Sequence, residues 1–122
     1  MITEDYVSFE VAKLLKEKGF AEPLVNYYYT AKGERVGYLM PEEQYLCPTH
    51  QMAMKWLREE KGVYIEIRRS INTFLFGAII KKYNEDNFHQ IPRNLNSYEQ
   101  AVEAALKYVL ENLLTFKIKE ES

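Results

Sequence analysis

The stretch VYIEIRRSINTFLFGAIIKKY, residues 63–83, contains two segments with the composition of β-strands and a short polar connection between them. In the first segment Val63, Ile65 and Ile67 recur at every second position, which is the period of a strand with one buried face. The second segment, residues 74–83, is apolar on both faces, as is typical of a central or doubly covered strand. Because only SINT joins the two segments, they are predicted to form an antiparallel hairpin.

A second hairpin is predicted upstream, in LVNYYYTAKGERVGYLM, residues 24–40. Apolar and aromatic residues alternate with others along its first strand, and Lys32–Gly33 supplies the turn because glycine tolerates positive φ. The two hairpins together predict a four-stranded, mainly antiparallel sheet. The side chains expected to point from this sheet into the main core are Val25, Tyr27, Val36, Tyr38, Val63, Ile65, Phe74 and Phe76.

Three segments have the periodicity of helices. The first, residues 8–18, begins with Ser8 as a candidate N-cap and ends before a glycine. The second is CPTHQMAMKWLREEKG, residues 47–62. The third begins where Ser97 and Gln100 match a capping box, and it continues as an unbroken apolar stripe. These segments are predicted to be helices that pack on one main face of the sheet.

The predicted order of elements is therefore α-ββ-α-ββ-α, with the polar segment 84–96 as a connection before the last helix. A chain of 122 residues is long enough to bury a core in a single domain and short for two. We expect one α+β domain over residues 1–122, with residues 117–122 as a frayed tail.

Composition and charge describe an ordinary globular protein. The hydrophobic fraction is 47%, the charged fraction is 28%, and the net charge of −2 gives no bulk attraction to nucleic acid. The stretch MITEDYVSFE lacks the basic start and apolar run of a secretory signal. No apolar stretch approaches the ~20 residues that a membrane helix needs. These features predict a soluble, cytoplasmic protein that does not contact a membrane.

Cys47 and His50 are the two residues that raise the question of a metal site or a catalytic Cys–His pair. A structural zinc site takes four ligands, mostly cysteine or histidine, whereas the chain has one cysteine and two histidines. A Cys–His nucleophile pair needs a base, an orienting group and oxyanion donors within reach, and the sequence identifies none of these. We favour the interpretation that Pro48 occupies the first turn of a helix that Cys47 or Thr49 caps.

Other catalytic or cofactor-binding patterns are missing. The five glycines stand apart, so the chain has no phosphate-binding loop. Adjacent carboxylates such as Glu59–Glu60 diverge by about 100° on a helix and are poorly placed to share one substrate. The sequence therefore predicts no cofactor, no metal and no catalytic residue, and an enzyme that depends on Cys47 is the least favoured of the functions considered.

Three segments together resemble a family of small proteins encoded in prophages and mobile elements of gut bacteria, for which no activity is established. The segments are SFEVAKLLKEKGF, CPTHQMAMKWLREEKG and SYEQAVEAALKY, which span most of the chain. The resemblance implies a phage or mobile-element origin. It brings no functional residue with it.

Strand alternation also predicts a candidate interaction surface on the face of the sheet that points away from the core. Its residues are Tyr28, Tyr64, Leu75 and Ile79, edged by Arg68 and Lys81. An aromatic and aliphatic patch of this kind is rarely left exposed on a monomer. Either the first helix folds over it, or it binds a protein partner or a second copy of the chain, or it stacks unpaired bases. We favour a non-catalytic protein-interaction module or a homo-oligomer, with a nucleic-acid-binding domain as the alternative.

Overall fold

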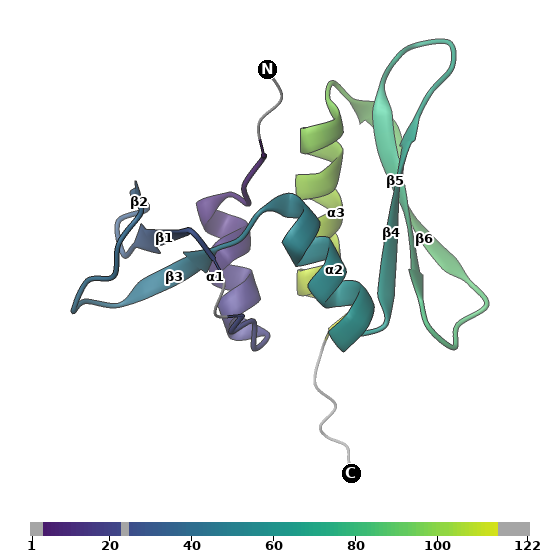
Figure 1. Ribbon diagram of the computed structural model, residues 1–122. Helices are drawn as coiled ribbons and strands as arrows, with labels where there is room; N and C mark the ends of the chain where they lie inside the picture. The colour runs from purple at the N-terminus through teal and green to yellow at the C-terminus, as the bar shows by residue number, and fades with distance from the viewer. Residues whose placement is uncertain (1–3, 23–24, 115–122) are drawn as a thin grey trace.

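The computed structural model describes residues 4–22 and 25–114, and it has α+β architecture with two antiparallel sheets (Figure 1). The predicted tail at 117–122 lies outside the described residues. The elements follow the order α-βββ-α-βββ-α. Their bounds are α1 Phe9–Glu17, β1 Tyr27–Thr30, β2 Arg35–Val36, β3 Gln44–Cys47, α2 His50–Glu60, β4 Val63–Arg69, β5 Phe76–Lys82, β6 Phe88–Leu95 and α3 Tyr98–Asn112.

The helices begin where the sequence places their caps. Ser8 Oγ accepts a hydrogen bond from the Val11 amide at 3.2 Å, and Ser97 Oγ accepts one from the Gln100 amide at 3.0 Å. Thr49, and not Cys47, caps α2, so Pro48 precedes the helix and does not occupy its first turn as predicted. Each cap satisfies one of the amide donors that a helix N-terminus leaves without an internal partner.

The first sheet has the strand order β2-β1-β3. The predicted hairpin forms β1 and β2, and its turn is closed by the Thr30 amide, which donates to the Glu34 carbonyl at 2.8 Å. Strand β3 then pairs with the other edge of β1, so that Tyr27 faces Cys47. Helix α1 packs on β3, which places this sheet and α1 at the left of Figure 1.

The second sheet is a meander with the strand order β4-β5-β6. Strands β4 and β5 pair in continuous register from Val63 with Lys82 to Arg69 with Phe76. Between β5 and β6 the register shifts near Phe76–Ala78. A β-bulge of this kind bends a strand and increases its twist.

Helices α2 and α3 form the layer that joins the two halves. They pack on one face of the second sheet, while α1 contacts α3 from the other side (Figure 1). The predicted stripe of α3 is the centre of the core, because its apolar residues are almost fully buried. These residues are Ala101, Val102, Ala105, Leu106, Val109 and Leu110.

Three predictions about the fold were wrong in detail. The four-stranded sheet is replaced by two three-stranded sheets. Strand β6 forms in the segment 84–96 that was predicted as a connection, and β3 forms where no element was predicted and ends at Cys47, which was predicted to start a helix. Tyr38 and Phe74 were expected in the core, yet their side chains are 62% and 61% exposed. Both lie outside the strands, where alternation no longer determines the direction of a side chain.

Helix α1 does not cover the second sheet. It packs against β3 and α3, on the far side of the α2–α3 layer (Figure 1). The face of the second sheet that points away from α2 and α3 is therefore open among the described residues.

Candidate functional site

The open face of the second sheet is the candidate site, and the strand register builds it in rows across β4, β5 and β6. Tyr64 faces Lys81, which in turn faces Phe88. In the next row Glu66 faces Ile79, and Ile79 faces Gln90. Residues at every second position of a strand share a face, so Arg68 belongs with Tyr64 and Glu66. Arg93 follows the register shift and lines one hollow with Arg68 and Ile79. We call these rows, with Arg68 and Arg93, the outer face.

Two aromatic rings stand out from this surface. Tyr64 is 50% exposed and Phe88 is 54% exposed, while Ile79 between the rows is half-buried. Lys81 lies between the two rings in the register and forms no ion pair among the described residues. Directly facing side chains on neighbouring strands have Cβ atoms about 5 Å apart, so Tyr64, Lys81 and Phe88 form one continuous row across the three strands.

The charge on the outer face has the opposite sign to that of the whole chain. Arg68 pairs with Glu66, with 3.1 Å between Arg68 Nε and Glu66 Oε2. Arg68 Nη2 also donates a hydrogen bond to Glu66 Oε1 at 3.4 Å, whereas Nε is buried and makes none. Arg68 also lines a hollow of about 260 Å³ together with Ile79 and Arg93. The outer face thus carries three cationic side chains, Lys81, Arg68 and Arg93, and one carboxylate, Glu66. The whole chain, in contrast, carries a net charge of −2.

The structure brings together four of the six residues that were predicted to form the interaction surface. Tyr64, Arg68, Ile79 and Lys81 lie on β4 and β5 of one sheet. Leu75 precedes β5. Tyr28 lies in the other sheet, facing Val36 and Leu46, where it lines a separate hollow of about 340 Å³ beside α1.

Sequence reasoning missed the contribution of β6, which supplies Phe88, Gln90 and Arg93. The alternation of Phe88 and Gln90 with His89 and Ile91 was the available signal. It was weak because the residues between Phe88 and Leu95 are mostly polar and include Pro92, and proline is unusual within a strand except at an edge.

Cys47 is a buried structural residue. Its side chain is fully buried, and Sγ lies 3.7 Å from the Val7 carbonyl oxygen. Burial raises the pKa of the thiol, which keeps it in the less nucleophilic, protonated form. Burial and the neighbouring Cys47 also raise the pKa of Tyr29 to about 12, and the Tyr29 hydroxyl donates to the Val7 carbonyl at 2.7 Å. Neither group is activated as a nucleophile.

His50 and Glu103 form a pair that the sequence does not reveal, because 53 positions separate them. His50 Nε2 lies 2.7 Å from Glu103 Oε2, and the same oxygen accepts the Ser8 amide at 3.0 Å. One carboxylate on α3 therefore connects the start of α2 to the start of α1. The pair lies on the wall of an open hollow of about 580 Å³.

The surroundings of Glu103 give the pair a structural function. Burial alone would raise the pKa of this carboxyl, but hydrogen bonds from His50 and Ser8 outweigh it and hold the pKa below its ordinary value of 4.5. The described residues contain no cluster of three or more metal-binding side chains that could use His50. Ser8, the nearest hydroxyl-bearing partner, is already engaged as the α1 cap.

We expect Glu103→Gln to weaken the fold in a pH-dependent way. Since the folded-state pKa lies below 4.5, the unfolded chain binds the proton more tightly, and the stabilisation is complete above pH 4.5 and lost as pH falls through the folded value. At neutral pH the variant should lose about 1–3 kcal/mol of unfolding free energy. Urea titrations between pH 3 and pH 7 test this.

Glu99→Gln is the matched control, because Glu99 lies on the same hollow and is exposed. Its stability should track the wild type at every pH. If Glu103→Gln and the wild type lose stability in parallel below pH 4.5, then Glu103 is not the group that carries this dependence.

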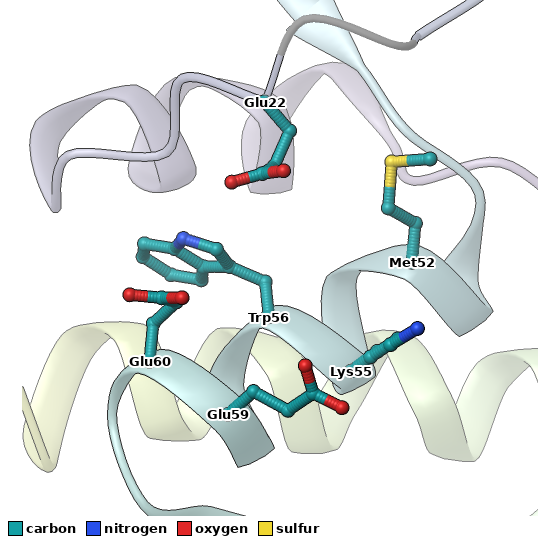
Figure 2. Close-up of a pocket in the computed structure, with 6 residues that line it drawn as sticks. All are labelled: Glu22, Met52, Lys55, Trp56, Glu59 and Glu60. Carbon is teal, nitrogen blue, oxygen red and sulfur yellow. The ribbon is translucent and has the colours of Figure 1, made fainter.

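Another hollow, of about 290 Å³, lies beside Trp56 (Figure 2). Figure 2 shows the carboxylates of Glu22 and Glu60 near the indole ring of Trp56. The ring itself is almost fully buried, and its centroid lies 5.3 Å from that of Phe20. Lys61 Nζ already lies 5.3 Å from the same ring, within the range of a cation–π contact. Trp56 is thus a core residue, and we assign no ligand to the carboxylates around it.

Comparison with protein-family models, with curated proteins and with solved structures finds no match to this chain. Within residues 4–22 and 25–114, no helix has the length and apolar character needed to cross a membrane.

Proposed function

We propose that this chain is a non-catalytic protein-interaction module of phage or mobile-element origin that acts in the cytoplasm and binds a protein partner through the outer face. The observation that carries the proposal is that α2 and α3 cover only one face of the second sheet. The other face keeps Tyr64 and Phe88 half-exposed beside Lys81. Exposed aromatic residues next to cationic ones are typical of the centre of a protein interface.

The chemistry of the face defines the partner that it fits. Two aromatic rings and Ile79 supply apolar area, and Lys81 and Arg93 supply positive charge without an ion-pair partner among the described residues. A partner surface that combines an apolar side chain with neighbouring Asp or Glu residues would complement both features. The net charge of −2 disfavours a long polyanion, because the rest of the chain repels it.

A site-specific photo-crosslinking experiment tests this proposal. A photoreactive phenylalanine at position 64 or 88, in the full chain expressed in its native cells, should crosslink to one protein. The same residue at Tyr38, which is 62% exposed but lies outside the second sheet, should not. The purified partner should then bind the wild type and lose at least about tenfold in affinity for Tyr64→Ala and Phe88→Ala, the effect of truncating a central aromatic anchor. Equal crosslinking at 38 and 64, or unchanged affinity in both alanine variants, would contradict the proposal.

Single-stranded nucleic acid is the second candidate, and the row Tyr64–Lys81–Phe88 is the observation that favours it. Bases stack on exposed aromatic rings while neighbouring cations contact phosphates. Titration of a single-stranded RNA at several salt concentrations separates the candidates. Tight, salt-dependent binding that Tyr64→Ala abolishes would favour the nucleic acid over the protein partner.

A further inference from the structure

The open edge of β4 is a second surface that shares Glu66 and Arg68 with the outer face, and the inference drawn from its backbone does not depend on what the outer face binds. Strand β4 has seven residues and pairs only with β5. An edge strand presents unpaired N–H and C=O groups and so offers a template for another strand. Proteins usually protect such an edge with charged side chains, with proline, with a bulge or by keeping it short.

The other strand edges in the described residues have such protection. Strand β2 has two residues and β3 has four, with α1 packed against β3. Strand β6 contains Pro92, which cannot donate a backbone hydrogen bond, and its pairing is interrupted by a register shift. Strand β4 is long, contains no proline and pairs with β5 without a register shift, and its charged side chains are of both signs, Glu66, Arg68 and Arg69.

The hydrogen-bond pattern identifies which residues of β4 face the open edge. Just beyond its two ends, the Tyr83 amide donates to the Gly62 carbonyl and the Ser70 amide donates to the Leu75 carbonyl, each at 2.7 Å. Hydrogen-bonded and non-hydrogen-bonded positions alternate in an antiparallel pair. The even-numbered residues therefore bond to β5, and the backbone groups of Ile65, Ile67 and Arg69 are directed to the open edge.

We propose that β4 pairs with β4 of a second copy of the chain, antiparallel about a two-fold axis at Ile67, to form a continuous six-stranded sheet. In this register Ile65 faces Arg69 of the second copy, and about six backbone hydrogen bonds form between the strands. Ile67 faces its own counterpart, and its half-buried side chain gains an apolar neighbour.

Charge complementarity selects this register. With the axis at Ile67, Glu66 of each copy faces Arg68 of the other at non-hydrogen-bonded positions, where side chains are closest. An axis at Glu66 or at Arg68 would instead place two like charges opposite each other, which is unfavourable. The side chains of Glu66 and Arg68 are 64% and 41% exposed, and among the described residues they pair only with each other. The two copies can therefore exchange their two internal ion pairs for two between the copies.

Sedimentation velocity on the full chain over a range of concentrations is the first test. The wild type should dimerise reversibly, and Glu66→Arg and Arg68→Glu should each weaken the dimer at least about tenfold, because each places like charges opposite each other twice. An equimolar mixture of the two variants should dimerise like the wild type, since every facing pair is then complementary. The double variant Glu66→Arg, Arg68→Glu should dimerise as well.

Each other outcome overturns the proposal. A wild type that stays monomeric at roughly 1 mM has no association of useful strength. If the dimer survives both single charge reversals, the copies do not pair in this register. The same conclusion follows if the mixture of the two variants does not dimerise. The variant Ile79→Lys, Phe88→Lys changes the outer face on β5 and β6 and leaves β4 unchanged, so it should leave the dimer intact; a dimer that this variant dissolves is built on the outer face. Thermal melts of all variants confirm that each is folded.

Discussion

Leu106→Asp should prevent the chain from folding stably. Leu106 is fully buried in the middle of α3, where the helix packs on the second sheet. An aspartate there has no cation within the apolar stripe, and burying an unpaired charge costs more than most single substitutions. A cost above about 5 kcal/mol is comparable with the whole stability of a domain of this size. Circular dichroism and thermal melting of the purified variant provide the measurement.

The control for this substitution is Asn112→Asp, which introduces the same side chain at the exposed end of α3. That variant should melt within a few degrees of the wild type. Leu106→Ala should lie between the two, with a loss of about 2–5 kcal/mol from the cavity that it creates. A soluble Leu106→Asp protein with near-native melting would contradict the placement of the α3 stripe at the centre of the core.

The features predicted correctly from the sequence are those determined within a few residues. Each cap, at Ser8 and at Ser97, depends on a hydroxyl oxygen that accepts a hydrogen bond from the amide three residues later. The α3 stripe depends on the helical period alone. The alternation in β4 placed Tyr64 and Arg68 on the face opposite Val63 and Ile65, as the register shows.

The features that were missed depend on contacts between distant residues. Nothing near Gln44–Cys47 indicates that this segment pairs with β1, and no strand was predicted there. The two sheets could not be distinguished from one, because hairpins associate through long-range packing that a local pattern does not encode. The contact between His50 and Glu103 likewise follows only from the way α2 and α3 cross.

Gly77→Ala should separate β6 from β5, because the backbone of β6 passes directly over Gly77. A Cβ at this position would overlap the Ile91 carbonyl oxygen and lie 2.7 Å from the Pro92 carbonyl carbon. These are backbone atoms of a paired strand, so they cannot move aside without breaking the pairing at the register shift. Overpacking usually costs about 1–3 kcal/mol, and we expect at least the upper end of this range. Urea unfolding and hydrogen exchange of the β6 amides measure the effect.

Gly37→Ala is the matched control, since a Cβ there would lie 3.8 Å from the nearest atom, in the Tyr27 ring. It should leave the stability unchanged or raise it by up to about 1 kcal/mol, because alanine restricts the unfolded chain.

Gly77→Ala should also affect function, because Gly77 lies on the outer face beside Ile79. Strand β6 brings Phe88 to Lys81 only while it stays paired with β5. Gly77→Ala should therefore weaken partner binding together with the protection of β6. If Gly77→Ala had native stability and protected β6 amides, then β6 would not cross at Gly77. The rows Tyr64–Lys81–Phe88 and Glu66–Ile79–Gln90 would then not describe the outer face.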